Sequence, residues 1–241
     1  MLDIMFTPMF SSLWKSLTLT LATALVCQTA LGQSVDGLYL MTRFWPSSGL
    51  EVAAYWFHNG AVVVNPIGSA RTLDVAAERA IHPKAVGTFK LSAGQLVMAM
   101  ADGNHQAKYE PETKGCFGWD AGIFCPVEIF RPGTTLDGTF SGGASVGGGA
   151  VMSSTTITFK ADGSYQRESV GSFSSKGAIG GVSGGTTGNE RGKYRVEGTA
   201  LHLIPDGGKE MVVSTFPYDD DTKGPAPRSL YFSGGMLKRI K

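Results

Sequence analysis

The sequence predicts an all-β chain built as an antiparallel meander, in two tandem barrel repeats, with one short helix in the first. Three observations predict this class. Glycine supplies 33 of the 241 residues, roughly twice its usual share, while charged residues are scarce at 17%. Polar and apolar residues alternate along short runs that end in glycine turns, which is typical of strands. Two halves of the chain also align with each other.

The charge balance excludes one class of function. Lys and Arg number 21 against 20 Asp and Glu, so the formal net charge is +1 at pH 7. Such a chain offers no basic surface for nucleic acid or for an anionic membrane. Hydrophobic residues make up 42%, which is enough for a buried core. We therefore expect a globular protein without a nucleic-acid partner.

Residues 1–32 have the pattern of a secretory signal peptide. Lys15 precedes the apolar run 17–26, and small residues at 30–32 fit a cleavage site before Gln33. The run is shorter than the ~20 residues that a membrane-spanning helix needs. The prediction is an exported chain that begins at Gln33 and has no transmembrane segment after signal removal.

Three alternatives at this end stay open. Met9 offers a second start site, with Lys15 closer to the first residue. Cys27 follows the apolar run and is a formal candidate for lipidation, although Val26 is an unusual residue to precede a lipidated cysteine. The apolar run could also be retained as an anchor.

The remaining cysteines predict one disulfide. Once Cys27 is removed with the signal, only Cys116 and Cys125 are left. In an oxidising compartment, two cysteines this close along the chain most simply form a local bridge. The segment 117–124 between them has a turn signal near its centre, so the bridge is expected to join a hairpin or a compact loop.

The internal repeat is carried by three blocks that keep their order and spacing. The matched pairs are 36–39 with 137–140, 55–60 with 157–163, and 87–103 with 192–207. Duplication is the favoured interpretation, and the alternative is chance recurrence of Gly-aromatic and Asp-Gly turns. We expect a first β-repeat with the disulfide at 33–131 and a second β-repeat at 132–241, joined near 131–135.

Each repeat contains about seven or eight candidate strands, and eight strands can close a small barrel. Residues 156–159 and 194–197 alternate between polar and apolar, and Asp162-Gly163 is a hairpin turn signal. Residues 96–100 are apolar on both faces of a strand, so this strand is expected to be covered on both sides, as where two repeats meet.

One helix is predicted in the first repeat. Its apolar residues fall at helical spacing from a cap at Thr72 to Ile81, and it ends before Pro83. The corresponding stretch of the second repeat, 171–188, is rich in Gly and Ser, as is 142–149. Both have too little apolar surface to offset their conformational entropy, so both are predicted to be loops.

A recurring pattern carries a resemblance. It runs Gly-x-aromatic, then Leu-x-Leu or Leu-x-Met, then Asp-Gly, at Gly87, Phe89, Leu96, Met98, Asp102 and Gly103, and again at Gly192, Tyr194, Leu201, Leu203, Asp206 and Gly207. This looks like the meander of lipocalin-like barrels in exported bacterial proteins. The resemblance implies two lipocalin-like barrels, a periplasmic or extracellular location, and space for a small apolar ligand. It implies no catalytic residue.

The sequence gives no catalytic residue, metal site or cofactor that we would predict. Gly-x-Ser-x-Gly occurs around Ser145 and Ser183, but neither has the following helix that a nucleophile elbow requires. The histidines, His58, His82, His105 and His202, lack metal-site spacing. Residues 219–221 begin like a calcium loop but lack oxygen ligands at its later positions.

Aromatic residues mark the candidate ligand site. They gather in the first repeat, and the candidate ligand-binding residues are Trp45, Tyr55, Trp56, Phe57, Phe117 and Trp119. The alternative is that these rings only fill a core. The predicted function is an exported, non-enzymatic β-barrel protein that binds a small apolar ligand or an envelope component. The alternative is a structural or protein-interaction module of the cell envelope without a ligand.

Overall fold

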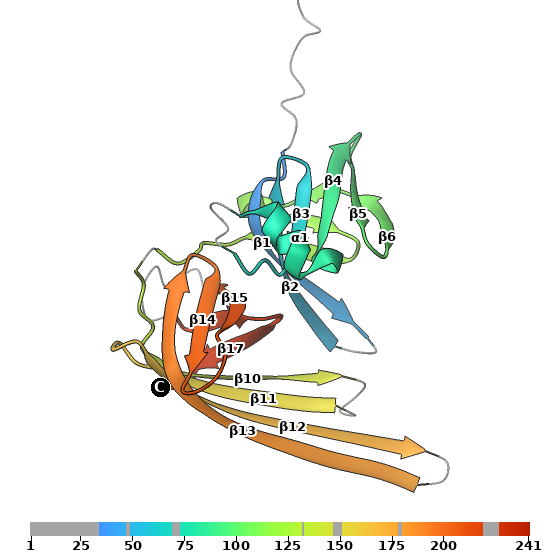
Figure 1. Ribbon diagram of the computed structural model, residues 1–241. Coiled ribbons are helices and arrows are strands. Elements are labelled where there is room, and N and C mark those ends of the chain that lie inside the picture. Colours follow the sequence, from blue (N-terminus) through green and yellow to red (C-terminus); the bar gives the residue numbers. More distant parts are fainter. Residues whose placement is uncertain are drawn as a thin grey trace, which may run out of the picture. The chain divides into compact units, whose positions relative to one another are not determined.

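The computed structural model describes residues 34–46, 49–68, 73–131, 133–146, 151–177, 180–218 and 227–241 (Figure 1). The predicted signal peptide at 1–32, with Met9, Cys27 and the expected start at Gln33, lies outside these residues. So do residues 219–221. Within the described part of the chain, no helix is long and apolar enough to cross a membrane.

The first half of this part forms a nine-stranded antiparallel sheet that curls into a nearly closed barrel. Its elements are β1 (Gly37–Trp45), β2 (Gly49–His58), β3 (Ala61–Val64), α1 (Val75–Ile81), β4 (Val86–Ser92), β5 (Gln95–Met100), β6 (Gly103–Lys108), β7 (Glu110–Pro111), β8 (Phe117–Trp119) and β9 (Gly122–Pro126). The strand order is β6-β5-β4-β3-β2-β1-β9-β8-β7, so β6 and β7 are the two edges.

The second half forms a closed antiparallel barrel. Its strands are β10 (Gly138–Val146), β11 (Val151–Phe159), β12 (Ser164–Gly177), β13 (Gly180–Glu197), β14 (Ala200–Pro205), β15 (Met211–Pro217), β16 (Ser229–Phe232) and β17 (Gly235–Arg239). Closure comes from β10 and β17, where Phe140 is opposite Arg239. The all-β class and the two tandem antiparallel barrels are therefore confirmed.

The two barrels share their strand connectivity and parts of their register. Gly37 is opposite Phe57 in β1–β2, as Gly138 is opposite Phe159 in β10–β11. The last hairpin returns to the first strand in both, since β9 pairs with β1 and β17 pairs with β10. The similarity of the halves thus extends past the three matched sequence blocks.

The halves differ in the connection before their fourth strand. In the first, this connection holds α1, whose N-cap is Asp74: its carboxylate accepts hydrogen bonds from Ala76 N at 2.9 Å and Ala77 N at 3.1 Å. The predicted helix is present and ends at Ile81 as expected. The expected cap, Thr72, lies outside the described residues.

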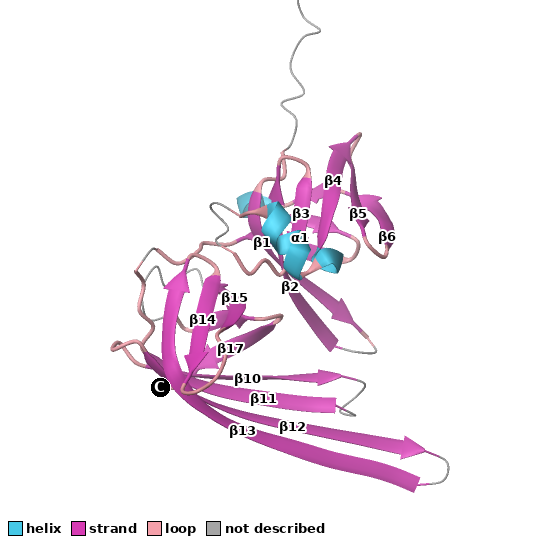
Figure 2. Cartoon of the chain, viewed as in Figure 1, coloured by secondary structure: helices cyan, strands magenta, loops and turns pink. Residues whose placement is uncertain are grey.

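In the second half, the same connection is replaced by a long ribbon of β12 and β13 (Figure 2). Pairing runs without a break from Ser164 opposite Lys193 to Gly177 opposite Gly180. The prediction of a loop at 171–188 was wrong, because these residues belong largely to β12 and β13. The prediction of a loop at 142–149 was wrong for residues 142–146, which belong to β10. Strand ladders satisfy main-chain groups by mutual hydrogen bonding, which needs no apolar side chains.

Period-two alternation divides the apolar residues into separate cores. On β1, Tyr39 and Met41 face the interior of the first barrel, whereas Leu38 and Leu40 belong to a cluster outside it. This shared cluster also holds residues of both halves: Ala54, Trp56, Val63, Val86, Phe216 and Tyr231. The strand at 96–100 was expected at the meeting face of the repeats, but the shared cluster contains none of its residues.

Tyr231 adds hydrogen bonds to the shared cluster. Its fully buried ring stacks on Phe216 at 4.5 Å between centroids. Its hydroxyl donates to Asn65 Oδ1 and accepts from Ala54 N at 3.2 Å. Burial raises the pKa of Tyr231 to about 12.

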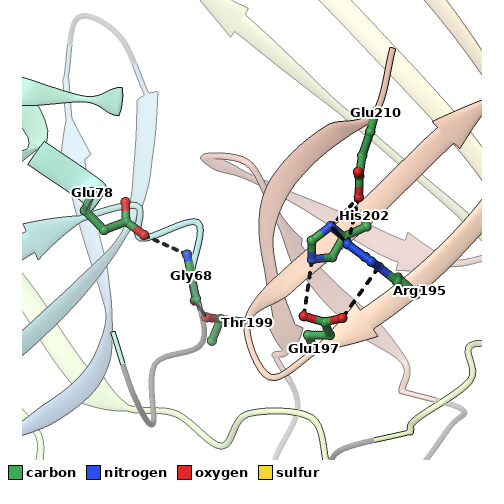
Figure 3. Close-up of polar contacts among 7 residues, drawn as sticks. All are labelled: Gly68, Glu78, Arg195, Glu197, Thr199, His202 and Glu210. Carbon is green, nitrogen blue, oxygen red and sulfur yellow. Dashed lines mark hydrogen bonds and ion pairs between the residues drawn. The ribbon is translucent and has the colours of Figure 1, made fainter. Parts of the chain in front are cut away.

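A second polar contact joins the halves beside α1. The buried carboxylate of Glu78 accepts hydrogen bonds from Ile67 N at 2.9 Å and Gly68 N at 2.7 Å, while Thr199 Oγ1 donates to Gly68 O (Figure 3). Residues 67–68, which precede α1, thus form hydrogen bonds with Glu78 of the first half and with Thr199 of the second.

Replacing Tyr231 with Phe should lower the free energy of unfolding by about 1–2 kcal/mol, because it removes a buried hydroxyl from between two partners. The measurement is urea unfolding followed by circular dichroism. Tyr218→Phe is the control, since Tyr218 is exposed. Equal unfolding free energies for the two variants would contradict the bridging role.

The same variant should change the pH dependence. The folded pKa of Tyr231 lies above the ordinary value of 10.0, so its contribution to stability is complete below pH 10 and is lost as pH rises toward 12. Tyr231→Phe should therefore lose less stability than the unmodified chain over this interval.

Candidate functional site

A cavity of about 980 Å³ opens at the end of the first barrel where β1, β5 and β8 finish. Its lining comes from the barrel, from the connection after β3, from β15, and from the turn between β16 and β17: Arg43, Tyr55, Val64, Asn65, Ile67, Ile81, His82, Pro83, Lys84, Ala85, Met98, Met100, Ala101, Asp102, His105, Trp119, Asp120, Val212, Val213, Ser214 and Ser233. Most of this surface is carbon, with a few polar groups at defined places.

Aromatic rings fill the rest of the barrel interior. Phe57, Phe117 and Phe124 are fully buried, and the rings of Phe117 and Phe124 stack at 4.8 Å with an interplanar angle of 7°. Tyr39 meets Phe57 and Phe117 edge to face. The interior is therefore closed at one end and hollow at the other.

The structure brings two of the six predicted ligand-binding residues to the cavity, Tyr55 and Trp119. Phe57 and Phe117 belong to the packed interior, as the core-filling alternative expected. Trp56 lies in the shared cluster, because neighbouring residues of a strand face opposite sides. Trp45, at the end of β1, is 39% exposed.

The disulfide holds the hairpin that carries Trp119. Cys116 and Cys125 are bonded, as the sequence predicted; Cys116 immediately precedes β8, and Cys125 lies in β9. Asp120 and Ala121 connect these strands with φ of 47° and 59°, the left-handed values of a tight hairpin turn. Trp119 Nε1 donates to Leu96 O at 2.8 Å, which fixes the ring against β5.

Arg43 is the site residue that the sequence reasoning missed. It follows Tyr39 and Met41 at period two, so β1 turns it inward, and its side chain is only 11% exposed. Its partner across the β1–β9 ladder is Gly122, where an added Cβ would lie 3.4 Å from Arg43 Nε. The signal that could have identified Arg43 is its position in β1, where a charged residue continues the alternating apolar residues Tyr39 and Met41.

Glu51 is opposite Arg43 in the β1–β2 ladder and accepts a hydrogen bond from Trp45 Nε1 at 2.7 Å, and few other groups balance the charge of Arg43. One terminal nitrogen lies 3.4 Å from Asp120 Oδ2, and the guanidinium carbon lies 5.3 Å from the centre of the Trp45 ring. Its Nε is buried and has no hydrogen-bond partner among the described residues.

Other titratable groups line the cavity besides Arg43 and Asp120: Tyr55, His82, Lys84, Asp102 and His105. Burial raises the pKa of Tyr55, and the nearby Arg43 partly offsets the rise. On the β5–β6 turn, Asp102 pairs with His105 at 3.0 Å, and this hydrogen bond lowers the pKa of Asp102. Asp102 is thus engaged locally, while Arg43 faces the hollow end of the barrel.

The remaining candidates do not form a reactive cluster. His58 contacts Asp36 at 2.7 Å. His202, on β14, lies between Glu210 and Glu197 with the Arg195 guanidinium beside it (Figure 3). The described part of the chain contains no group of three or more His, Cys, Asp or Glu that could hold a metal ion.

The two Gly-x-Ser-x-Gly sequences lie in strands. Ser145 is in β10 and Ser183 is in β13, and both strands continue into hairpins with the next strand of the barrel. Neither serine stands at the strand-to-helix turn that a nucleophile elbow requires.

The chain matches no protein-family model, no curated protein and no solved structure. Its function is therefore argued from the cavity and its lining.

Proposed function

We propose that this chain is an exported, non-enzymatic protein that binds a small apolar ligand, or the apolar part of an envelope component, in the cavity of the first barrel. The observation that carries the proposal is the hollow end of that barrel, about 980 Å³ in volume. Sites for small ligands commonly measure about 300–1,000 Å³ and combine apolar walls with a few polar groups.

The walls suit a flexible or flat apolar molecule. Met98 and Met100 of β5 line the cavity together with the Tyr55 and Trp119 rings. Methionine side chains adapt to ligands of irregular shape, and aromatic faces give large contact areas. The packed rings of Phe57, Phe117 and Phe124 close the inner end, so a ligand would enter from one side.

Export is supported by two independent features. Residues 1–32 have the charge and hydropathy pattern of a signal peptide. Cys116 and Cys125 form a disulfide, and such bonds persist in oxidising compartments. A periplasmic or extracellular location in a bacterium, and a lipocalin-like assignment, belong to this proposal.

A larger side chain in the cavity should weaken the binding of an apolar ligand. Val64 lies opposite Tyr55 in the β2–β3 ladder and lines the hollow, so Val64→Phe should weaken binding of an apolar fluorescent probe such as N-phenyl-1-naphthylamine by about tenfold or more. Val170→Phe is the matched control, since Val170 is exposed on β12. Equal affinity in both variants, with circular dichroism unchanged, would argue against the cavity as the binding site.

Export predicts a defined covalent mass. Protein recovered from the exported fraction of a bacterial host should begin at Gln33 and should gain the mass of two hydrogen atoms on reduction of the Cys116–Cys125 bond. Intact mass spectrometry before and after reduction measures both quantities. A chain that retains residues 1–32 in full would contradict cleavage, and a mass unchanged by reduction would contradict oxidation in the host.

An exposed apolar patch favours a second function, a protein-interaction module of the envelope. Phe44 is 70% exposed and Leu50 63% exposed, and they are opposite each other at the end of the β1–β2 hairpin. Ile123 of β9, 45% exposed, pairs with Thr42 on the same face. Exposed apolar side chains that adjoin one another are typical of contact surfaces.

The double variant Phe44→Ser, Leu50→Ser separates the two functions. If the patch is a contact surface, a cross-linked product of defined mass in the exported fraction should disappear while probe binding in the cavity remains. Val170→Ser with Ile204→Ser controls for the loss of exposed apolar area elsewhere. An identical cross-linking pattern in both double variants would rule against this second function.

A further inference from the structure

We infer that Arg43 is an anion-binding residue, and that the ligand of the cavity is an amphiphile with one carboxylate or similar acidic group on an apolar body. This inference rests on the proposed function and specifies the ligand class. The acidic group would lie against the Arg43 guanidinium, and the apolar body would lie along Met98, Met100 and Trp119.

The first argument is the incomplete satisfaction of Arg43. A guanidinium carries five N–H donors, and the side chain is only 11% exposed. The described residues provide one ion pair, to Asp120 at 3.4 Å, and leave the buried Nε without a partner. Buried donors are nearly always hydrogen-bonded in folded proteins, so the unsatisfied donor indicates a partner that comes from outside the chain.

The second argument is that a further unsatisfied polar atom lies on the same cavity. Ser214 Oγ is buried without a hydrogen-bond partner, and across the described ranges the only other such side-chain atom is Arg43 Nε. Both residues line this cavity. Donors that remain free around one hollow fit an acceptor-rich group inside it.

The third argument concerns the space around the guanidinium. Gly122 leaves the strand opposite Arg43 without a side chain, and an added methyl group would lie 3.2 Å from Met41 Sδ as well as 3.4 Å from Arg43 Nε. The Trp45 ring lies beside the guanidinium at 5.3 Å. The Arg43 guanidinium therefore has neighbours along its sides. A planar guanidinium can bind a carboxylate through two parallel hydrogen bonds.

The fourth argument is that Asp120 is a weak competitor for this charge. Its side chain is 51% exposed, so water screens its interaction with Arg43. A ligand carboxylate inside the cavity could approach the same guanidinium from the less solvated side.

The test compares an acid with its neutral ester. The fluorescent probes are 11-(dansylamino)undecanoic acid and its methyl ester, titrated into the full exported chain. The acid should bind about tenfold tighter than the ester, because only the acid forms a charge-assisted pair. Arg43→Met should remove that preference, weakening the acid about tenfold or more while changing the ester less than about twofold. Arg43→Lys should restore part of it, since lysine keeps the charge but lacks the planar fork.

Two further variants complete the design. Asp120→Asn removes the competing carboxylate and keeps a residue that tolerates positive φ, so acid binding should become tighter. Arg191→Met is the matched control: Arg191 is 84% exposed and pairs with Asp206 away from the cavity, so the loss of one positive charge there should leave the acid preference intact. Circular dichroism and the thermal midpoint of each variant check the fold.

The outcomes separate the inference from the function on which it rests. Equal binding of acid and ester, unaffected by Arg43→Met, would overturn the inference and leave apolar ligand binding in place; water would then satisfy Arg43. Failure of both probes to bind the unmodified chain would overturn the proposed function and the inference together. If Arg43→Met failed to fold, an acid preference that is unchanged by both Arg43→Lys and Asp120→Asn would also overturn the inference.

Discussion

The architecture of the first barrel depends on the pairing of β1 with β9. This ladder joins the first and the last strand of that half of the chain, from Tyr39 opposite Pro126 to Arg43 opposite Gly122. Because β9 also forms a hairpin with β8, the same ladder carries Trp119 and Asp120 to the side of Arg43. The Cys116–Cys125 bond fixes that hairpin from its other end. This return strand and its hairpin therefore bring Trp119 and Asp120 to the cavity lining beside Arg43.

The two barrels use one connectivity for different interiors. The core of the second contains Phe140, Phe159, Tyr194 and Leu203, and the Tyr194 hydroxyl hydrogen-bonds to the backbone of Leu136. Arg167 of β12 is opposite the core residue Ile157 and pairs with Glu190 at 3.4 Å, and both side chains are partly buried. In the first barrel, the repeat offset aligns Arg43 with Ala144 of the second. The inward Arg167 of the second barrel is opposite Glu190, whereas Arg43 of the first is opposite Gly122 in the β1–β9 ladder.

The halves are also joined by contacts that neither could make alone. The shared cluster contains Trp56 of the first half and Phe216 of the second. The Tyr231 hydroxyl forms hydrogen bonds with Ala54 N and Asn65 Oδ1 of the first half. Thr199 holds Gly68, which Glu78 also holds (Figure 3). Since Ser214 of the second half lines the cavity of the first, these contacts also complete its wall.

The sequence by itself determined the fold class, the repeat, the helix ending at Ile81 and the disulfide, because each depends on local patterns: alternation, turn residues, helical spacing and short cysteine separation. It also identified Tyr55 and Trp119 as candidate site residues, and both line the cavity. It did not separate them from Phe57 and Phe117, since all four are apolar residues of the first repeat, and their roles depend on how far along the barrel each lies. Strand pairing also made a ribbon of 171–188, where composition predicted a loop, because main-chain ladders require a partner strand and little apolar surface. Only the tertiary structure placed Arg43 against Gly122 and left its Nε unsatisfied, because the strands that meet there are far apart in the chain.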